Sequence, residues 1–149
     1  MKRLIVLILV LAGILALTCG MSGLGGPSAT VIPEPDENYT VTVIDKSLVS
    51  APAWNVTCDG DTFLVGLRGK AQVAIDFEKI QAVDFVSGDQ GFQNAAVLFW
   101  DGSSHEIKVK NMVRCSGRTD IGIMQIKVRD IHRIEFIQGT KSTGDTSSP

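Results

Sequence analysis

The chain has 149 residues, a length typical of one domain. Hydrophobic residues make up 44% of it and charged residues 20%, a globular composition that excludes disorder throughout. Its three cysteines are too few for a disulfide-dense miniprotein, and no CxxC pair indicates zinc or redox chemistry. Removing Lys2 and Arg3 from the 14 basic residues leaves 12 against 16 acidic residues, so we expect no nucleic-acid partner.

The first residues have the layout of a secretory leader. Lys2 and Arg3 precede an apolar run over residues 4–17, and this order of charged and hydrophobic segments directs export. Residues 1–19 are therefore predicted to be a leader, with the protein periplasmic, extracellular or on the cell surface. Three fates of the leader stay open: lipidation of Cys19, retention as a membrane anchor, or cleavage among the small residues that follow. We expect membrane contact only through this leader or a lipid on Cys19.

Two segments lack any apolar period. Residues 20–39 are rich in Gly, Ser and Pro and become acidic, which predicts a flexible tether. Residues 139–149 are small and polar, which predicts a disordered tail. The folded domain is therefore expected over residues 40–138.

Within that domain the dominant hydrophobic period is two. In the segment 104–110, Ile107 and Val109 alternate with charged residues, and the segment 71–77 alternates in the same way. Such alternation is typical of strands with one solvated face, as in antiparallel sheets. Because Gly-containing turn signals separate these segments, the sequence predicts an all-β fold.

The sequence also contains an internal repeat. Val73–Phe85 aligns without gaps onto Met124–Phe136, with Ile and Phe recurring at the same places. An Asp-Gly turn precedes each copy, at residues 59–60 and 101–102, and extends the units to about 54–86 and 96–137. We therefore expect a small antiparallel sandwich or partly open barrel built from two duplicated β units.

The segment from Gly117 to Phe136 resembles a β module that recurs in uncharacterised bacterial envelope proteins. The shared pattern is a Gly-led strand, a turn that ends in Ile, and then Ile-Glu-Phe, here residues 134–136. The resemblance implies a structural module of the envelope and transfers no catalytic or binding residues.

Two cysteines form a candidate disulfide. Cys58 and Cys115 each lie beside a turn, one in each repeat unit, and export would place them in an oxidising compartment. A bond between them would link the two units. The alternative is two buried free thiols.

The residues that carry out chemistry are sparse. His105 and His132 have no Asp, Cys or Ser at a spacing that indicates a nucleophile or a metal site. Asp59 and Asp61 flank a glycine but lack the other oxygen ligands of a calcium loop. We therefore expect no catalytic residue, no metal and no cofactor.

These features predict a non-enzymatic, envelope-tethered β module that binds an envelope protein, a polysaccharide or copies of itself. The candidates for an exposed aromatic binding patch are Trp54, Phe92, Phe99 and Trp100. One alternative is an enzyme with an unrecognised acidic or histidine site, for which the available residues are His105, His132, Asp59 and Asp61. Another is a purely structural, self-assembling subunit.

Charges reverse sign between the two copies of the repeat. If equivalent strands met antiparallel near Phe77 and Val128, opposite charges would face each other across the strands. The predicted inter-unit pairs are Asp76 with Arg129 and Glu78 with Lys127.

Overall fold

A computed structural model describes residues 37–138, which fold into ten β-strands. The strands are β1 (Val41–Asp45), β2 (Ser50–Cys58), β3 (Phe63–Arg68), β4 (Ala71–Asp76), β5 (Ile80–Ser87), β6 (Phe92–Phe99), β7 (Ser104–Lys110), β8 (Arg114–Thr119), β9 (Gly122–Lys127) and β10 (Ile131–Phe136). Two short 3-10 turns, η1 (Phe77–Lys79) and η2 (Val128–Asp130), precede β5 and β10. The predicted all-β class is confirmed.

Several predictions concern residues outside this range. The leader with Cys19, most of the tether and the tail lie outside the described residues. Within residues 37–138 we find no helix with the length and apolar character needed to span a bilayer.

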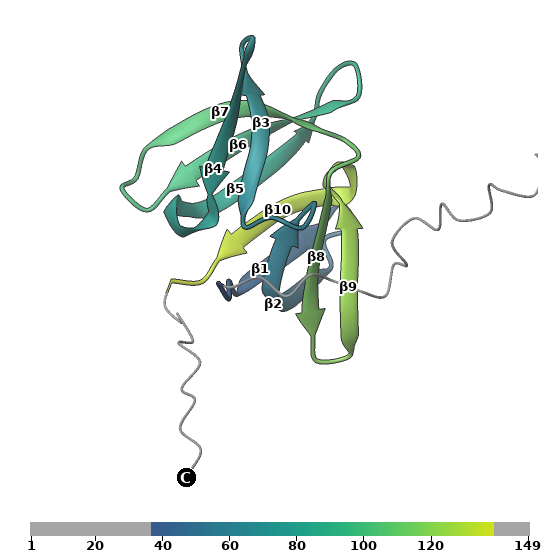
Figure 1. Ribbon diagram of the computed structural model, residues 1–149. Coiled ribbons are helices and arrows are strands. Elements are labelled where there is room, and N and C mark those ends of the chain that lie inside the picture. Colours follow the sequence, from purple (N-terminus) through teal and green to yellow (C-terminus); the bar gives the residue numbers. More distant parts are fainter. Residues whose placement is uncertain (1–36, 139–149) are drawn as a thin grey trace, which may run out of the picture. The chain divides into compact units, whose positions relative to one another are not determined.

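The ten strands form one antiparallel sheet in the order β4-β3-β7-β6-β5-β10-β1-β2-β8-β9. The sheet curls into a half-barrel, in which β3–β7 form the upper part in Figure 1 and the other strands the lower part. The alternation in β7 is as predicted, with Ile107 and Val109 buried and the neighbouring lysines exposed. Curling brings such apolar faces together and removes them from water.

The two halves meet at β5 and β10, in the middle of the strand order. Val83 pairs with Ile134, and these residues occupy the same position in the two copies of the repeat. An approximate twofold axis therefore passes between them and relates Phe77 to Val128. Equivalent strands do meet antiparallel, but on β5 and β10 and not near Phe77 and Val128.

Each copy of the repeat contributes its first hairpin to the other half. The β1–β2 hairpin precedes β3 in the chain, yet it lies between β10 and β8. The β6–β7 hairpin precedes β8, yet it lies between β5 and β3. The expected equivalence of the two Asp-Gly turns is wrong, because residues 59–60 connect β2 to β3 while residues 101–102 connect β6 to β7.

Two glycines at equivalent positions allow the exchanged hairpins to pack closely. A Cβ atom on Gly66 of β3 would lie 2.7 Å from Cδ1 of Ile107 on β7. A Cβ atom on Gly117 of β8 would lie 3.0 Å from Cγ2 of Val56 on β2. At both positions a side chain could therefore be added only if an atom of the neighbouring strand moved.

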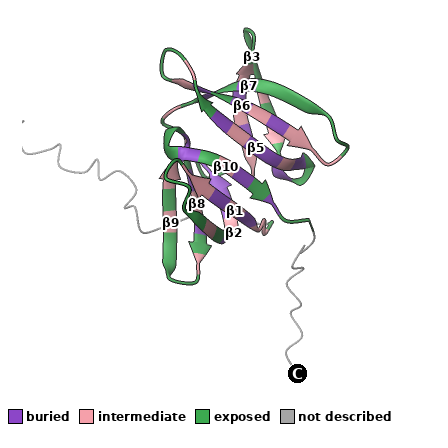
Figure 2. Ribbon diagram, turned by 180° about the vertical axis from the view of Figure 1, so that it is seen from behind, coloured by how far each residue is buried: buried purple, intermediate pink, exposed green. Residues whose placement is uncertain are grey.

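Apolar side chains from both halves form one core, and the largest fully buried ones are Phe85, Leu64, Ile80 and Ile131. Figure 2 shows the buried residues concentrated on the inner strands. The strands at the two ends of the sheet, β4 and β9, contain no fully buried residue. The core therefore depends on strands that come from both copies of the repeat.

A disulfide joins β2 to β8. Cys58 and Cys115 face each other in the strand register, with their Cα atoms 4.0 Å apart and their sulfur atoms bonded. The two cysteines are separated by 57 residues, and closing a loop of this size stabilises the fold by about 4 kcal/mol in the chain-entropy treatment. Because β2 and β8 belong to different copies, the bond links the two copies.

Candidate binding pocket

A pocket with a volume of about 490 Å³ lies beside η1, where β1 begins and β10 ends. This volume is within the range of small-molecule sites. The residues that line it are Glu37, Asn38, Tyr39, Thr40, Phe77, Glu78, Trp100, Phe136, Ile137 and Gln138. They include four aromatic side chains and two carboxylates, and none of them is basic.

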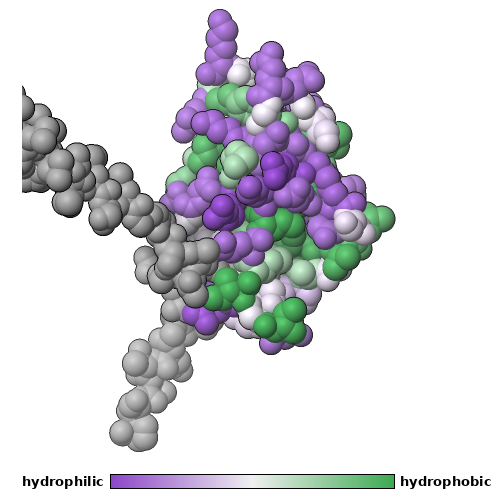
Figure 3. Space-filling model, turned by 90° about the vertical axis from the view of Figure 1, so that its right-hand side faces the viewer, coloured by the Kyte–Doolittle hydropathy of each residue, from purple (hydrophilic) through white to green (hydrophobic). Residues whose placement is uncertain are grey.

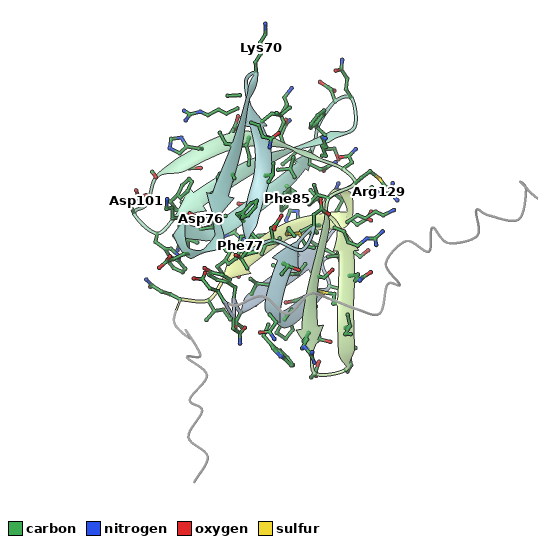
Figure 4. All side chains as sticks on the ribbon, viewed as in Figure 1. Lys70, Asp76, Phe77, Phe85, Asp101 and Arg129 are labelled. Carbon is green, nitrogen blue, oxygen red and sulfur yellow. A yellow bond between two sulfur atoms is a disulfide. The ribbon has the colours of Figure 1, made fainter. Side chains whose placement is uncertain are left out.

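Aromatic side chains form the floor of the pocket. The Phe77 ring packs against Phe136, with centroids 5.1 Å apart, and meets Tyr39 edge-on, with centroids 5.7 Å apart. Phe77 is 2% exposed and Phe136 is 8% exposed, so both rings are anchored in the core. Figure 4 shows Phe77 between the upper and lower parts of the sheet. Tilted and edge-to-face packing makes this floor stable as well as apolar.

The turn that follows β6 holds Trp100 at the pocket. The backbone N–H of Trp100 donates to the carbonyl of Lys79 in η1 at 3.3 Å. The turn is closed by Asp101, whose Oδ1 accepts from the Ser103 hydroxyl at 2.6 Å and from its backbone N–H at 2.8 Å. These hydrogen bonds, the one from the Ser103 hydroxyl first, lower the pKa of Asp101. They therefore favour the ionised carboxylate that closes the turn.

The residues just before β1 form the rim of the pocket. Oδ1 of Asn38 accepts the backbone N–H of Asn55 at 3.0 Å, and the carbonyl of Tyr39 accepts the N–H of Val56 at 3.4 Å. Asn55 has a φ of 51° and lies where the β2–β8 register shifts. This irregularity in β2 therefore positions the rim.

The environment of Tyr39 is acidic. Its hydroxyl donates to Oε2 of Glu37 at 2.5 Å. Burial, this hydrogen bond and the negative charges of Glu37, Glu78 and Asp76 raise the pKa of Tyr39 well above its ordinary value. Tyr39 therefore stays a neutral hydrogen-bond donor at any physiological pH, next to three carboxylates.

The four predicted aromatic candidates do not form one patch. Trp100 lines the pocket, and the ring of its neighbour Phe99 meets His105 with centroids 5.7 Å apart. Phe92 lies at the opposite end of β6, and Trp54 lies on β2 with 38% of its surface exposed. Of the four, Trp100 is therefore the residue that belongs to a candidate site.

The predicted pairs of Asp76 with Arg129 and of Glu78 with Lys127 are wrong. They required β4 to lie beside β9, but these strands are at opposite ends of the sheet. Figure 4 shows Asp76 and Arg129 well apart. The sign reversal between the copies therefore does not stabilise a contact between these strands.

Charges do pair across the twofold axis, but on β5 and β10. Nη1 of Arg133 lies 2.6 Å from both carboxylate oxygens of Asp84, its partner in the strand register. Nε of Arg133 also donates to Oε1 of Glu135 at 2.7 Å. These two hydrogen bonds, the one to Asp84 first, raise the pKa of Arg133. The ion pair between the halves thus uses residues that we did not predict.

The remaining residues with chemical potential are dispersed. His105 lies on β7 and His132 on β10, while Asp59 and Asp61 flank the β2–β3 turn. Oδ1 of Asp59 accepts the backbone N–H of Arg114 at 2.9 Å, which is a structural role. Across residues 37–138, no three His, Cys, Asp or Glu side chains come together in a group that could hold a metal ion.

Sequence reasoning missed most of the pocket. Tyr39, the chain's one tyrosine, falls within the predicted tether because the apolar period begins after it. Phe77 ends the alternating segment 71–77 and Phe136 is a recurring position of the repeat, and neither pattern indicates a pocket. The two carboxylates, Glu37 and Glu78, carry no local signal of a site.

Residues 35–139 match the model of a protein family described as an uncharacterised protein. The chain belongs to this family. The match spans the whole described domain, and the finer resemblance to envelope proteins stays a prediction. Neither the curated proteins nor the solved structures gave a match.

Proposed function

We propose that this chain is an exported, non-enzymatic β module that binds an envelope component in the pocket between Tyr39 and Trp100. The observation that carries the proposal is a pocket whose floor is the packed, buried rings of Phe77 and Phe136 and whose partly exposed sides include Tyr39 and Trp100. A preformed apolar cavity with a few polar groups at its rim is the usual form of a binding site.

Two observations support the location. The leader pattern of residues 1–19 directs a chain out of the cytoplasm. The Cys58–Cys115 disulfide is consistent with an oxidising compartment.

The dispersal of reactive groups supports binding over catalysis. A hydrolytic site needs a nucleophile or general base held by a second polar group. His105 has an aromatic neighbour in Phe99, and His132 is exposed on β10. Of the two carboxylates that line the pocket, Glu37 accepts the hydroxyl of Tyr39, which suits recognition better than proton transfer.

Tryptophan fluorescence tests this function directly, because the chain has two tryptophans and Trp100 lines the pocket. The Trp54→Phe variant leaves Trp100 as the reporter, and the Trp100→Phe variant leaves Trp54 as a matched control. Each is titrated with soluble peptidoglycan fragments, with envelope polysaccharide and with dispersed envelope lipids. We expect one of these to change Trp100 emission saturably and to leave Trp54 emission unchanged. No change from any of them would contradict the proposal.

A second candidate, a self-assembling subunit, is favoured by the edges of the sheet. Within residues 37–138, β4 and β9 each pair with one neighbour, which leaves a row of backbone donors and acceptors along each edge. Ile121, in the turn before β9, is 94% exposed, and Ile123, on β9, is 49% exposed. Figure 3 faces the side where β8 and β9 lie in Figure 1, and hydrophobic residues gather in the lower part of this surface.

Sedimentation velocity over a wide range of concentrations distinguishes this second candidate. Strand addition at β9 would give oligomers that the Ile123→Lys substitution dissolves, because a lysine on an edge strand opposes pairing. A chain that sediments as a monomer at every concentration would contradict self-assembly.

A further inference from the structure

We propose that the ligand of the pocket is an organic cation, an ammonium group carried on an aliphatic body. This inference rests on the proposed binding function and names the chemical class of its ligand. It is carried by the charges around the pocket, by its aromatic walls and by the site that the twofold axis relates to it.

The charges at the pocket are all of one sign. Glu37 and Glu78 line it, and none of the ten lining residues is basic. Glu78 is exposed and has no ion pair with another residue of the described chain. The nearby Asp76 is partly neutralised by Lys79 at 3.7 Å, but both side chains are more than 60% exposed, so that pair screens little. An anionic ligand would therefore be repelled and a cation attracted.

The walls of the pocket suit a cation with apolar substituents. The faces of aromatic rings attract an ammonium group, and they also bury its aliphatic groups. Tyr39 and Trp100, which are partly exposed, supply the accessible ring surface, and the buried rings of Phe77 and Phe136 lie beneath it. A small hydrated metal ion would gain little from these rings, whereas an alkylated ammonium would use both them and the carboxylates.

The twofold axis relates Trp100 to Lys46. The backbone N–H of Trp100 donates to the Lys79 carbonyl at 3.3 Å. In the same way, the backbone N–H of Lys46 donates to the Asp130 carbonyl at 2.9 Å. Lys79 and Asp130 occupy the same position in the two copies of the repeat. Trp100 and Lys46 therefore have equivalent places in the two halves.

The residue equivalent to Tyr39 is Gln93. Val41 pairs with Phe136 and Ala95 pairs with Phe85, so the strands β1 and β6 superpose with Tyr39 on Gln93. This second site contains an ammonium group, because Nζ of Lys46 donates to Oε1 of Gln93 at 3.1 Å.

The two sites therefore differ in where a cation comes from. In one half the fold supplies its own ammonium, because the exposed Lys46 places its Nζ on the buried Gln93. In the other half the lysine is replaced by Trp100, and the pocket is left open and acidic. A cation from outside would complete in this half the arrangement that Lys46 completes in the other.

The test uses choline and its neutral isostere, 3,3-dimethylbutan-1-ol, with the Trp54→Phe chain as reporter. The two probes have nearly the same shape, so their difference in affinity measures the contribution of the charge. We expect choline to bind about tenfold more tightly than the alcohol, and the difference to shrink at high salt.

Two variants locate the effect. Glu78→Gln should weaken choline binding several-fold and leave binding of the alcohol unchanged. Arg129→Gln, at the equivalent position of the other half, should change neither. Equal binding of both probes would overturn the cation inference and leave the binding function intact. Binding of neither would overturn the inference as well, and the screen with envelope fractions would then decide the function separately.

Discussion

The two ends of the molecule that the twofold axis exchanges have the same backbone and different chemistry. Around η1, the aromatic side chains of Tyr39, Phe77 and Trp100 enclose a pocket. Around η2, the equivalent residues are Gln93, Val128 and Lys46, and a hydrogen bond connects the two polar ones. The two equivalent sites thus share a backbone arrangement but differ in their side chains, and the pocket lies at the aromatic one.

The side chains of the polar site form hydrogen bonds with one another. Oε1 of Gln93 accepts from Lys46 at 3.1 Å, and Nε2 of Gln93 donates to Oδ1 of Asn111 at 2.8 Å. Lys46 also donates to Oγ of Ser87 at 3.3 Å. At the aromatic site, Tyr39 satisfies its hydroxyl at the rim, on Glu37, and its ring forms a wall.

The largest expected effect comes from the disulfide, which one half of the molecule contains and the other lacks. The disulfide links β2 to β8, whereas Leu64 occupies the position equivalent to Cys115 in the other half. The Cys58→Ala/Cys115→Ala double variant should lose about 4 kcal/mol of unfolding free energy, measured by urea denaturation. Dithiothreitol should destabilise the natural chain and leave the double variant unchanged. Peptide mapping that finds both residues as free thiols in the unreduced chain would contradict the bond.

The next largest effect on unfolding free energy is expected at Phe77 and Val128, the equivalent residues at the centres of the two sites. Phe77→Ala should cost about 3 kcal/mol of unfolding free energy, because it removes a buried ring that packs against Phe136. Val128→Ala removes two methyl groups and should cost about half as much. Phe77→Ala should also abolish choline binding, and Val128→Ala should leave it unchanged. Equal effects of the two substitutions on binding would show that the pocket does not depend on its floor.

A smaller effect tests the polar site. Lys46→Met keeps the aliphatic stem but removes the donor to Gln93, whose side chain is only 4% exposed. Leaving that amide oxygen without its partner should cost about 1–2 kcal/mol in urea denaturation. Lys79→Met, which removes an exposed ion pair with Asp76, is the control and should cost about 0.5 kcal/mol or less. If the two variants lose the same stability, Lys46 does not complete the polar site.

The smallest effect concerns pH at the aromatic site. Because Tyr39 is the one tyrosine of the chain, ultraviolet titration of phenolate reports it alone. Its pKa is raised in the folded chain by burial first and then by Glu37, so ionisation should begin well above pH 10. The stability that this gives is fully present below the unfolded pKa near 10, and it is lost as pH rises from there toward the folded pKa. Glu37→Gln should lower the folded pKa, and an unchanged titration would exclude Glu37 as a cause.

The comparison also shows which predictions could succeed. The period of two in residues 104–110 and the repeated pattern of Val73–Phe85 and Met124–Phe136 are local properties, and the strands that they predict are present. The cysteines beside turns are bonded. The charge pairs failed because they required knowledge of which strands are neighbours. Asp76 and Lys127 carry the same signal whether β4 and β9 touch or lie at opposite ends of the sheet.

The all-β class follows from local patterns in the chain, because alternating apolar residues form strands and a duplicated pattern forms two copies of one unit. The arrangement of these strands depends on contacts between distant residues. The tertiary structure exchanged the β1–β2 and β6–β7 hairpins between the copies, placed the axis at Val83 and Ile134, and brought Tyr39, Phe77, Trp100 and Phe136 to one place. The physical reason is that alternation fixes which face of a strand is apolar, whereas the neighbour of that strand is chosen by packing among residues far apart in the chain. Gly66 and Gly117 illustrate this choice, since each makes room for a hairpin that no residue near it in the sequence predicts.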